Sequence, residues 1–385
     1  MKKSIGVVFG GRSAEHEVSI ITAHIPIIQS LEATGQFEVW PIYISKTGLW
    51  YANQDFNDLK YFQADDWEEK VSREKNITLS LENGLRIIWP GLRQKSVKLD
   101  MVFPSMHGTY GEDGSLMGIL RMANVPFVGC DMAASAVAMD KVLTKQVLSA
   151  ENIPIVPYVW FSKQDWQNGK NELKEKIKKL SWPVFVKPVH LGSSIAITKV
   201  SAEEGLENAI EVALHYDDKV LVEESVEDLI EVTLPIMGNH DLKTAELERP
   251  LNKTEFLDFK DKYLSGSKKG QTNSQGYSEI PAKIDPELDR QAKELGKRVY
   301  KTLGCSGIAR VDFLIDSSSQ TVYVNEVNTL PGSLYHHNWK QAGVSGIELV
   351  TKLVALAEEK FAEQKSLTYI FNSDILKKNN GTKIS

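Results

Sequence analysis

Residues 310–332 read RVDFLIDSSSQTVYVNEVNTLPG. Two apolar stretches flank a polar turn, DSSSQ, and this pattern is typical of a β-hairpin. Arg310, Asp312, Glu326 and Asn328 interrupt the apolar pattern at positions that should be half buried. If the turn is centred on its third serine, antiparallel pairing sets Asp312 opposite Glu326 and Arg310 opposite Asn328. The pattern therefore predicts that all four side chains project from one face of the hairpin.

This polar face has a chemistry that suits a metal ion. Two opposed carboxylates repel each other unless a cation lies between them. The carboxylates of Asp312 and Glu326 and the amide oxygen of Asn328 are hard ligands for Mg²⁺, which normally also recruits substrate phosphates. Arg310 beside such an ion would neutralise negative charge that develops on an oxygen in a transition state. The alternative is an exposed cluster of surface ion pairs, but the polar NTLPG segment and the lysine motifs upstream favour the metal site.

Length, charge and cysteine content narrow the class of protein. The chain has 385 residues, 42% of them hydrophobic and 25% charged, and this length predicts two or three domains. A net charge of −6 argues against a nucleic-acid-binding protein, although local clusters of Lys and Arg can still bind anions. Cys130 and Cys305 lie in apolar surroundings, so we expect small buried side chains in a reducing compartment rather than a disulfide framework. No apolar run reaches the roughly 20 residues of a membrane span, and the apolar stretch at the start is too short for a signal peptide. We therefore expect a soluble, cytoplasmic protein without membrane partners.

The order of strand and helix patterns predicts three units and a tail. Strands and helices alternate over residues 1–130, beginning with the buried strand IGVVFGG, which indicates a doubly wound α/β domain. Residues 131–222 combine helices with two strands around the loop VHLGSSIA and form a central unit. Residues 223–365 read as antiparallel, with a long polar segment at 252–282, and therefore have α+β character. The tail, residues 366–385, is expected to fray.

Two lysine motifs indicate a site for an anion. Lys187 lies inside the apolar strand WPVFVKP, where an unpartnered ammonium is costly, so we interpret it as an inward-facing phosphate ligand. Gly192, Ser193 and Ser194 follow shortly after, and such small residues let backbone amides approach phosphate oxygens while both hydroxyls donate. This spacing is not the P-loop pattern GxxxxGK[ST]. Lys141, in MDKVLTK, begins or lies within a helix, where a surface position is the alternative.

Three glutamates further along fit a nucleotide. Glu223 and Glu224 end the strand KVLVEE, and Glu231 begins the next apolar segment. Such carboxylates can hold a ribose hydroxyl or an adenine amine, and solvated strand ends are the alternative.

Taken together, these motifs resemble one enzyme family. The order of Lys141, FVKP with GSS, VLVEE, Glu231 and the hairpin is similar to the ATP-grasp superfamily. Two further stretches, GGRSAEHEVS at 10–19 and HGTYGEDGSLMG at 107–118, closely resemble the N-terminal signatures of D-alanine–D-alanine ligases. The resemblance runs from about residue 4 to 360. It implies an N-terminal α/β domain followed by a two-subdomain ATP-grasp fold.

The resemblance implies that residues 131–222 and 223–365 are the two ATP-grasp subdomains. It also implies an activity. Such ligases use ATP to convert one D-alanine into an acyl phosphate, which the amine of a second D-alanine attacks to give D-alanyl-D-alanine for peptidoglycan precursors. They bind two Mg²⁺ (or Mn²⁺) ions, and many are homodimers. One alternative is a ligase of the same fold that joins D-alanine to D-serine, or, with less support, to D-lactate. Another is a non-catalytic regulator that binds a nucleotide. The intact hairpin set and Lys187 favour an enzyme, because a binding protein need not keep them all.

Residue by residue, the resemblance assigns roles. Seven residues would contact ATP. Its phosphates or base would be bound by Lys141 and Lys187, and its phosphates by Ser193 and Ser194. Its adenine would lie beside Glu223 and Glu224, and its ribose would be bound by Glu231. The two metal ions would be held by Asp312, Glu326 and Asn328. Arg310 would stabilise the tetrahedral adduct together with a backbone amide of the NTLPG segment, at Gly332. Glu15 would bind the ammonium of the first D-alanine, with His107 near its carboxylate and Ser193 linked to Glu15.

Residues 252–282 resemble the family's mobile loop, which keeps water away from the acyl phosphate, and a plain disordered loop is the alternative. Its Lys262 would meet the γ-phosphate, and its Tyr263 would complete the link to Ser193 and Glu15. Tyr263 also argues against D-lactate, because ligases that make the D-lactate product carry a histidine there.

The segment after NTLPG, SLYHHNWKQAGVS, departs from the family. The typical enzyme has a Ser–Leu pair several residues further on, which receives the carboxylate of the second substrate. Either Ser333 and Leu334 take this role in a shortened loop, or His336, His337 and Asn338 form a different subsite. Exposed loop histidines are the remaining alternative. The choice between D-alanine and D-serine as second substrate depends on this loop.

Overall fold

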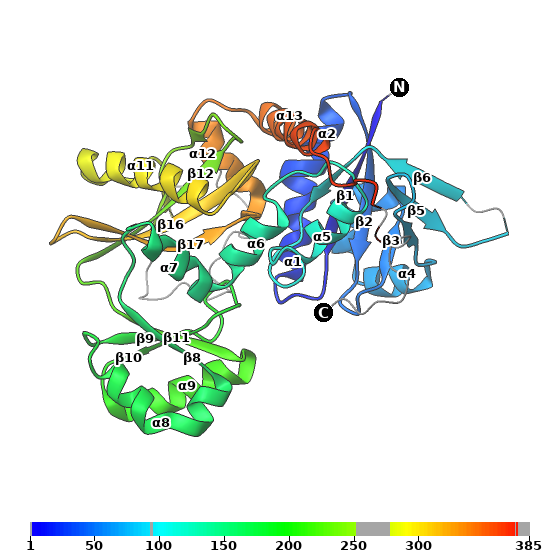
Figure 1. The fold of residues 1–385 in the computed structure, drawn as a ribbon. Coiled ribbons are helices and arrows are strands. Elements are labelled where there is room, and N and C mark those ends of the chain that lie inside the picture. Colours follow the sequence, from blue (N-terminus) through cyan, green and yellow to red (C-terminus); the bar gives the residue numbers. More distant parts are fainter. Residues whose placement is uncertain (1, 93–94, 252–277, 374, 376–385) are drawn as a thin grey trace.

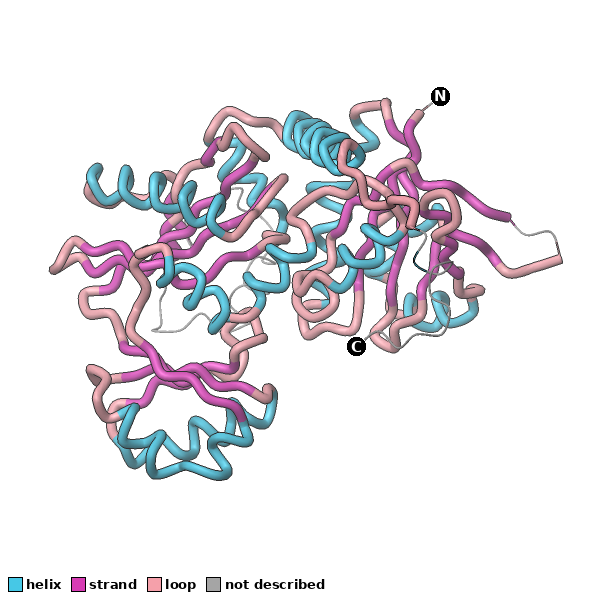
Figure 2. Tube along the Cα trace, viewed as in Figure 1, coloured by secondary structure: helices cyan, strands magenta, loops and turns pink. Residues whose placement is uncertain are grey.

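The computed structural model describes residues 2–92, 95–251, 278–373 and 375. The chain forms an N-terminal region, a smaller central region and a C-terminal region, coloured blue to cyan, green, and yellow to orange in Figure 1. Each region is built on a sheet with helices packed beside it (Figure 2). No helix in the described part of the chain is long and apolar enough to cross a membrane. This mixed α/β architecture agrees with the strand and helix patterns of the sequence.

The N-terminal region is centred on a mostly parallel sheet with the strand order β3-β2-β1-β7. Its strands are β1 (Lys3–Gly10), β2 (Phe37–Ile44), β3 (Trp50–Ala52) and β7 (Met101–Pro104). The helices after β1 form one run of α1 (His16–Thr22), a π-helical stretch (Ala23–Ile28) and α2 (Gln29–Ala33). β1 is apolar because both of its faces are buried. Phe9 packs with this helical run, and Val8 packs into a second core with α5 (Ser115–Met122).

The sequence between β3 and β7 folds into small elements that its poor periodicity did not predict. These are α3 (Leu59–Gln63), α4 (Trp67–Arg73), β4 (Thr78–Ser80), β5 (Leu85–Trp89) and β6 (Lys95–Leu99). The three strands form an antiparallel sheet. This sheet places Leu85, Ile87 and Leu99 in the core that it shares with β2.

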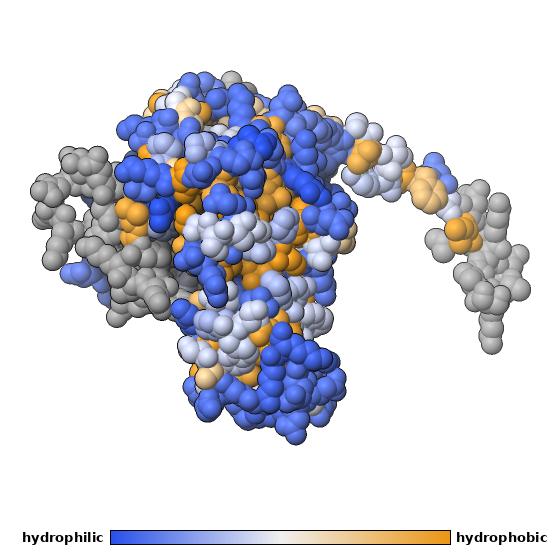
Figure 3. Space-filling view, turned by 90° about the vertical axis from the view of Figure 1, so that its left-hand side faces the viewer, coloured by the Kyte–Doolittle hydropathy of each residue, from blue (hydrophilic) through white to orange (hydrophobic). Residues whose placement is uncertain are grey.

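The central region is an antiparallel sheet, in the order β10-β9-β11-β8, with two helices on one face (Figure 1). Its elements are β8 (Tyr158–Ser162), α8 (Lys163–Ile177), β9 (Val184–Pro188), β10 (Thr198–Val200), α9 (Leu206–Tyr216) and β11 (Lys219–Glu224). The outer surface at this end of the molecule is hydrophilic (Figure 3), in keeping with the lysine-rich sequence of α8. Val186 and Val222 pack against the helices, so the alternate positions Lys187 and Glu223 face the opposite way.

The C-terminal region is an antiparallel sheet in the order β13-β12-β16-β17. Its elements are β12 (Leu229–Met237), β13 (Lys243–Thr244), β14 (Arg249–Pro250), β15 (Ser278–Glu279), α11 (Pro286–Thr302), β16 (Ile308–Asp316), β17 (Thr321–Asn328), a 3-10 turn (Gly332–Tyr335), α12 (His336–Gln341) and α13 (Gly346–Lys365). α11 covers one face of the sheet together with α6 (Met132–Met139) and α7 (Lys141–Ala150). Cys130 and Cys305 are free and buried in this core, as expected from the sequence.

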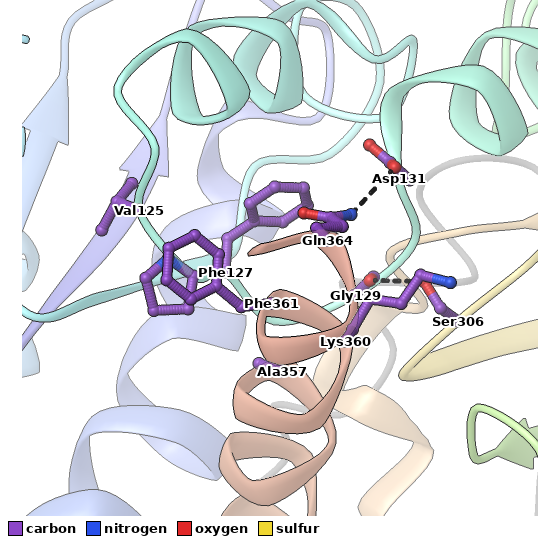
Figure 4. Close-up of a pocket in the computed structure, with 10 residues that line it drawn as sticks. Val125, Phe127, Gly129, Asp131, Ser306, Ala357, Lys360, Phe361 and Gln364 are labelled. Atoms are coloured by element: carbon purple, nitrogen blue, oxygen red, sulfur yellow. Dashed lines mark hydrogen bonds between the residues drawn. The ribbon is translucent and has the colours of Figure 1, made fainter. Parts of the chain in front are cut away.

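Contacts between the N-terminal and C-terminal regions fix their arrangement. α13 packs against α2 and shares its core. A small pocket lies beside this contact, where the segment before α6 meets the end of α13 (Figure 4). There Gln364 donates to Asp131 at 3.4 Å, and the hydroxyl of Ser306 donates to the carbonyl of Gly129 at 3.2 Å. The residues around this pocket include none of those proposed above for the site, so it belongs to the junction.

The β16–β17 hairpin contains an irregularity that decides which side chains share a face. Phe313 pairs with Val324, but the neighbouring Asp312 pairs with Glu326. Asn325 is therefore an extra residue, a β-bulge, in this described hairpin.

The bulge sets the charged face of the hairpin. A regular ladder from Phe313 onward would place Glu326 opposite Val311, a core residue, and turn its carboxylate inward. With the bulge, the predicted pairs of Asp312 with Glu326 and of Arg310 with Asn328 are confirmed. The pairs nearer the turn are shifted by one residue from a regular ladder, because the prediction contained no bulge.

We predict that deletion of Asn325 leaves the fold intact, because the remaining residues form a regular ladder with the same pairs at Asp312 and Arg310. Deletion of Val327, further along the same strand, is the matched control. It removes a core side chain and moves Asn328 inward, which should cost about 2–5 kcal/mol of unfolding free energy. Thermal and urea unfolding of the two variants distinguish these outcomes, and equal destabilisation would contradict the bulge.

Candidate active site

The charged face of the hairpin is largely shielded and internally paired. Nε and Nη2 of Arg310 donate to the two carboxylate oxygens of Asp312 at 2.6 and 2.5 Å. Oε1 of Glu326 lies 3.9 Å from the same guanidinium. Asn328 accepts the backbone N–H of Leu330 at 3.0 Å and so shapes the start of the NTLPG segment. Because the side chains of Arg310 and Asp312 are only 14% and 13% exposed, this face is not an open surface.

The donor set on this face fits a divalent metal ion. Asp312 and Glu326 lie opposite each other, and Asn328 lies on the same side of the hairpin. Carboxylate and amide oxygens are the ligands that Mg²⁺ and Mn²⁺ prefer. The assignment of these three residues as metal ligands stays a prediction.

α7 begins at this face. Asp140 caps the helix by accepting the backbone N–H of Val142 at 2.9 Å, which sets Lys141 at the first helical position. Nζ of Lys141 donates to the carbonyl oxygen of Leu191 at 2.6 Å and lies 3.9 Å from Oε2 of Glu326. Burial lowers the pKa of Lys141, an effect that Glu326 opposes. Lys141 is therefore a largely shielded lysine between the central region and the hairpin, with its side chain 12% exposed, not an open surface lysine.

Lys187 and Glu223 belong to a buried charge cluster with a third member that sequence reasoning missed. Lys187 contacts one carboxylate oxygen of Glu223, and Nζ of Lys145 lies 2.9 Å from the other. Burial alone would raise the pKa of Glu223, but the two ammonium groups hold it at about 2. Lys145 lies four residues after Lys141 on α7, so both side chains share one helix face. This spacing in MDKVLTK is the signal that could have identified it.

The other two glutamates lie outside this cluster. Glu224 is the next residue on β11, and its carboxylate accepts the backbone N–H of Ser181 at 2.9 Å. Glu231 is an exposed residue of β12, paired with Leu314 of β16. Their roles toward adenine and ribose stay predictions.

The GSS loop reaches across to the N-terminal region. The hydroxyl of Ser193 donates to Glu15, a residue 178 positions away in the chain. Ser193 and Ser194 have positive φ values of 54° and 57°, and a Cβ at Gly192 would lie 3.4 Å from Glu15. The loop therefore turns tightly against that carboxylate. The predicted partners Lys262 and Tyr263 lie outside the described residues.

Glu15 opens onto a cleft with a cationic lining. The cleft has a volume of about 310 Å³, and its walls include Arg12, Lys46, Gly192 and His190. Such a lining suits an anionic or zwitterionic ligand.

His107 is buried beside a polar chain that joins two parts of the site. Its Nε2 lies 3.0 Å from the hydroxyl oxygen of Thr22, and the same oxygen accepts the backbone N–H of Ser333 at 3.0 Å. Its Nδ1 lies 3.6 Å from Glu112, whose other oxygen accepts the backbone N–H of Gly108 at 2.9 Å. Burial lowers the pKa of His107, but Glu112, with smaller contributions from Glu15 and the backbone of Leu330, raises it overall. Sequence reasoning missed Thr22 and Glu112, although Glu112 lies in the second N-terminal signature and Thr22 follows three residues after the first.

The turn after NTLPG begins at Gly332 and is left-handed. Ser333, Leu334 and Tyr335 have φ values of 51°, 51° and 49°. The side chain of Leu334 is buried in the core, and the ring of Tyr335 lies 5.0 Å from the guanidinium carbon of Arg310. Ser333 is thus the member of the Ser–Leu pair whose backbone faces Thr22.

The histidines after this turn have protein partners. Nδ1 of His336 lies 3.0 Å from the carbonyl oxygen of Ser333, and Nε2 of His337 lies 3.2 Å from Glu248. Asn338 is buried and donates to the carbonyl of Glu246 at 3.1 Å. These contacts hold the turn in place, and the identity of the residues that bind a second substrate stays a prediction.

A histidine cluster anchors the base of the GSS loop. Nδ1 of His190 lies 2.9 Å from Asp217, and its Nε2 lies 3.3 Å from Asp140. Lys219 donates to Asp140 at 2.7 Å. Asp140 and Asp217 raise the pKa of His190 to about 9, so the ring is an imidazolium near neutral pH. Because Asp140 also caps α7, this cluster connects the helix that carries Lys141 to the GSS loop.

Comparison with known proteins identifies the class of protein. Two family models match the chain, "D-ala D-ala ligase N-terminus" over residues 4–130 and "D-ala D-ala ligase C-terminus" over residues 147–355. The chain is 35% identical over 373 residues to the D-alanine–D-alanine ligase of Thermosipho africanus, which covers 97% of this chain and 98% of the relative. It is 38% identical over 363 residues to D-alanine–D-alanine ligase B of Clostridium tetani, with 93% and 94% covered.

Solved structures agree with this class. The D-alanine–D-alanine ligase from Coxiella burnetii has a TM-score of 0.79 at 30% identity and covers 95% of this chain and 96% of its own. The VanG D-Ala:D-Ser ligase from Enterococcus faecalis has a TM-score of 0.78 at 32% identity, with 93% and 100% covered. The architecture is that of an ATP-grasp enzyme, so the predicted fold class is confirmed. The chain belongs to the D-alanine–D-alanine ligase family, as the resemblance implied.

We predict that the His190 cluster makes stability fall at alkaline pH. The pKa of His190 is raised from 6.5 to about 9 in the folded state, so its stabilisation is complete below pH 6.5 and is lost as the pH rises through about 9. Because the ring is partly exposed, the effect should not exceed about 1 kcal/mol. Urea unfolding at pH 6.5 and pH 10 measures it. The loss of stability between these two pH values is also measured for the His190→Asn variant, because the variant and the unmodified protein share all other titrating groups. An equal loss of stability in the variant would rule out His190 as the source.

Proposed function

We propose that this protein is an ATP-dependent ligase that joins two D-alanine molecules into D-alanyl-D-alanine, with release of ADP and phosphate, for peptidoglycan precursor synthesis. Membership of the family supports this proposal. The observation that carries it is the gathering of Arg310, Asp312 and Glu326 on one hairpin face beside Lys141. Metal ligands, a transition-state cation and a phosphate-binding lysine are the groups that transfer of a phosphoryl group to a carboxylate needs.

The chain's own residues account for the proposed reaction in order. Lys141 and Lys187 bind the ATP phosphates, while Glu15 binds the ammonium of the first D-alanine. The carboxylate of that D-alanine attacks the γ-phosphorus, the bond to the β-phosphate oxygen breaks, and an acyl phosphate and ADP form. The amine of the second D-alanine then attacks the acyl carbon. Arg310 stabilises the oxygen that becomes negative, and phosphate leaves as the amine loses its proton.

In this proposal Asp312, Glu326 and Asn328 hold two Mg²⁺ or Mn²⁺ ions, which neutralise phosphate charge when bound. Lys262 and Tyr263 of the predicted lid meet the γ-phosphate and complete the link to Ser193. Consumption of ATP and the two free, buried cysteines support a cytoplasmic location. We further infer a homodimer on the strength of the family resemblance, which sedimentation at several protein concentrations would test.

A second candidate is D-alanyl-D-serine formation. The similarity to the VanG D-Ala:D-Ser ligase favours it, as does the altered turn at Ser333–Tyr335. D-lactate as the second substrate is disfavoured by Tyr263.

The deciding experiment supplies Mg·ATP and D-alanine and measures phosphate release, with products identified by mass. We expect D-alanyl-D-alanine and phosphate in equal amounts. Added D-serine or D-lactate then competes for the second subsite, and a preference for D-serine would replace D-alanine in the proposal. Binding of ATP without any D-alanine-dependent phosphate release would identify a nucleotide-binding regulator instead.

We predict that Glu326→Gln lowers kcat by roughly 10²–10⁴-fold, because a neutral amide binds a divalent ion poorly and leaves phosphate charge uncompensated. The fold should remain, as checked by circular dichroism. Glu294→Gln is the matched control, because Glu294 is an exposed residue of α11 paired with Arg290, and it should leave kcat unchanged. Near-normal turnover of a folded Glu326→Gln enzyme would show that this hairpin face does not bind the metal.

A further inference from the structure

The buried cluster of Lys145, Glu223 and Lys187 contains more charge than a simple ion pair. The side chains of Lys145 and Glu223 are 2% and 1% exposed, and that of Lys187 is 11% exposed. Two ammonium groups share one carboxylate here. A buried charge is costly unless it is paired, and one ammonium group would be enough to pair one carboxylate. The second buried ammonium group therefore needs a physical explanation.

The central sheet holds the carboxylate in a fixed position between two rings. Glu223 pairs with Tyr158 of β8 on one side and with Phe185 of β9 on the other. Directly opposed residues of antiparallel strands share a face, so both rings flank the carboxylate. Nζ of Lys145 lies 5.5 Å from the centre of the Tyr158 ring, and Nζ of Lys187 lies 5.7 Å from that of Phe185. Each ammonium therefore approaches Glu223 over its own aromatic ring.

The two lysines differ in how accessible their ammonium groups are to a ligand. Lys145 projects from α7, is almost fully buried and has the oxygen of Glu223 at 2.9 Å. Lys187 lies near the end of β9 and is the more exposed of the two. It is also a predicted phosphate ligand, so a nucleotide and Glu223 would compete for the same ammonium.

We propose that Lys145 is a positioning residue that acts as the standing counter-ion of Glu223 and so leaves Lys187 free to move to the nucleotide. This inference rests on the proposed function, because the competing ligand is ATP. Without nucleotide, Lys187 is held on Glu223. When the phosphates attract Lys187, Lys145 keeps the carboxylate paired, and no unpaired charge is left in the interior. The second ammonium is thus required at the moment of binding.

The test begins with Lys145→Met, which removes the charge and keeps the unbranched side chain up to the ε position. Lys187 is then the remaining lysine on Glu223, and its transfer to phosphate would strand a buried carboxylate. We expect the Kd for Mg·ATP, measured by calorimetry, to rise tenfold or more. The KM for ATP should rise in parallel, whereas kcat at saturating ATP should change less than about threefold. Lys145→Arg keeps the charge and should restore most of the affinity.

A double variant separates this role from a structural one. Lys145→Met with Glu223→Gln removes the carboxylate together with its counter-ion, so Lys187 is no longer held. This double variant should bind ATP more tightly than Lys145→Met alone, whereas damage to packing would only add to the loss. When Lys145→Met is added to Glu223→Gln, the affinity for ATP should fall by less than about threefold. This comparison can still be made if the Lys145→Met variant alone does not fold.

Two results would overturn the inference. One is a Lys145→Met enzyme that binds ATP as the unmodified protein does. The other is a loss of tenfold or more on adding Lys145→Met to Glu223→Gln, which would mean that Lys145 contacts the nucleotide directly. If the unmodified protein binds no ATP at all, the proposed function fails and this inference falls with it. The same titrations distinguish these cases.

Discussion

The β-bulge at Asn325 is the constraint on which the candidate site depends. Side chains of a strand alternate between faces, so one extra residue reverses the face of everything that follows. On the turn side of the bulge, Val324 faces the core, and beyond it Val327 does. Glu326 and Asn328 are thereby released to the face that carries Arg310 and Asp312. With Asn325 in the strand, its extrusion from the ladder therefore satisfies the core and the charged face together.

Single long-range contacts also join the other residues of the candidate site across the regions of the molecule. Lys141 reaches from the start of α7, Ser193 reaches from the central region to Glu15, and Ser333 reaches from the C-terminal region to Thr22. Each contact joins residues that are far apart in sequence. The site therefore exists only when the regions are docked, and the packing of α13 on α2 is part of its construction.

Sequence reasoning succeeded where a local pattern carried the information. The polar positions of the hairpin revealed the pairing of Asp312 with Glu326, because both strands and the turn lie within one short stretch. It did not reveal the bulge, since no residue type marks Asn325 as unpaired. Lys145 looked like any helical lysine, because its burial depends on Glu223, which comes from a strand more than 70 residues later. Thr22 was equally inconspicuous, since its partners His107 and Ser333 lie 85 and 311 residues further along the chain.

The turn after NTLPG, where the sequence departs from the family pattern, is tied to the charged face of the hairpin. Three successive residues other than glycine, Ser333 to Tyr335, adopt positive φ values, and each costs on the order of 1–3 kcal/mol. Burial of Leu334 and the stacking of Tyr335 on Arg310 oppose that cost. Because the same guanidinium pairs with Asp312, the conformation of the turn and the position of Arg310 are coupled. A change in this segment would therefore act first on the geometry at the hairpin face, and the choice of second substrate would follow from where the turn places its backbone.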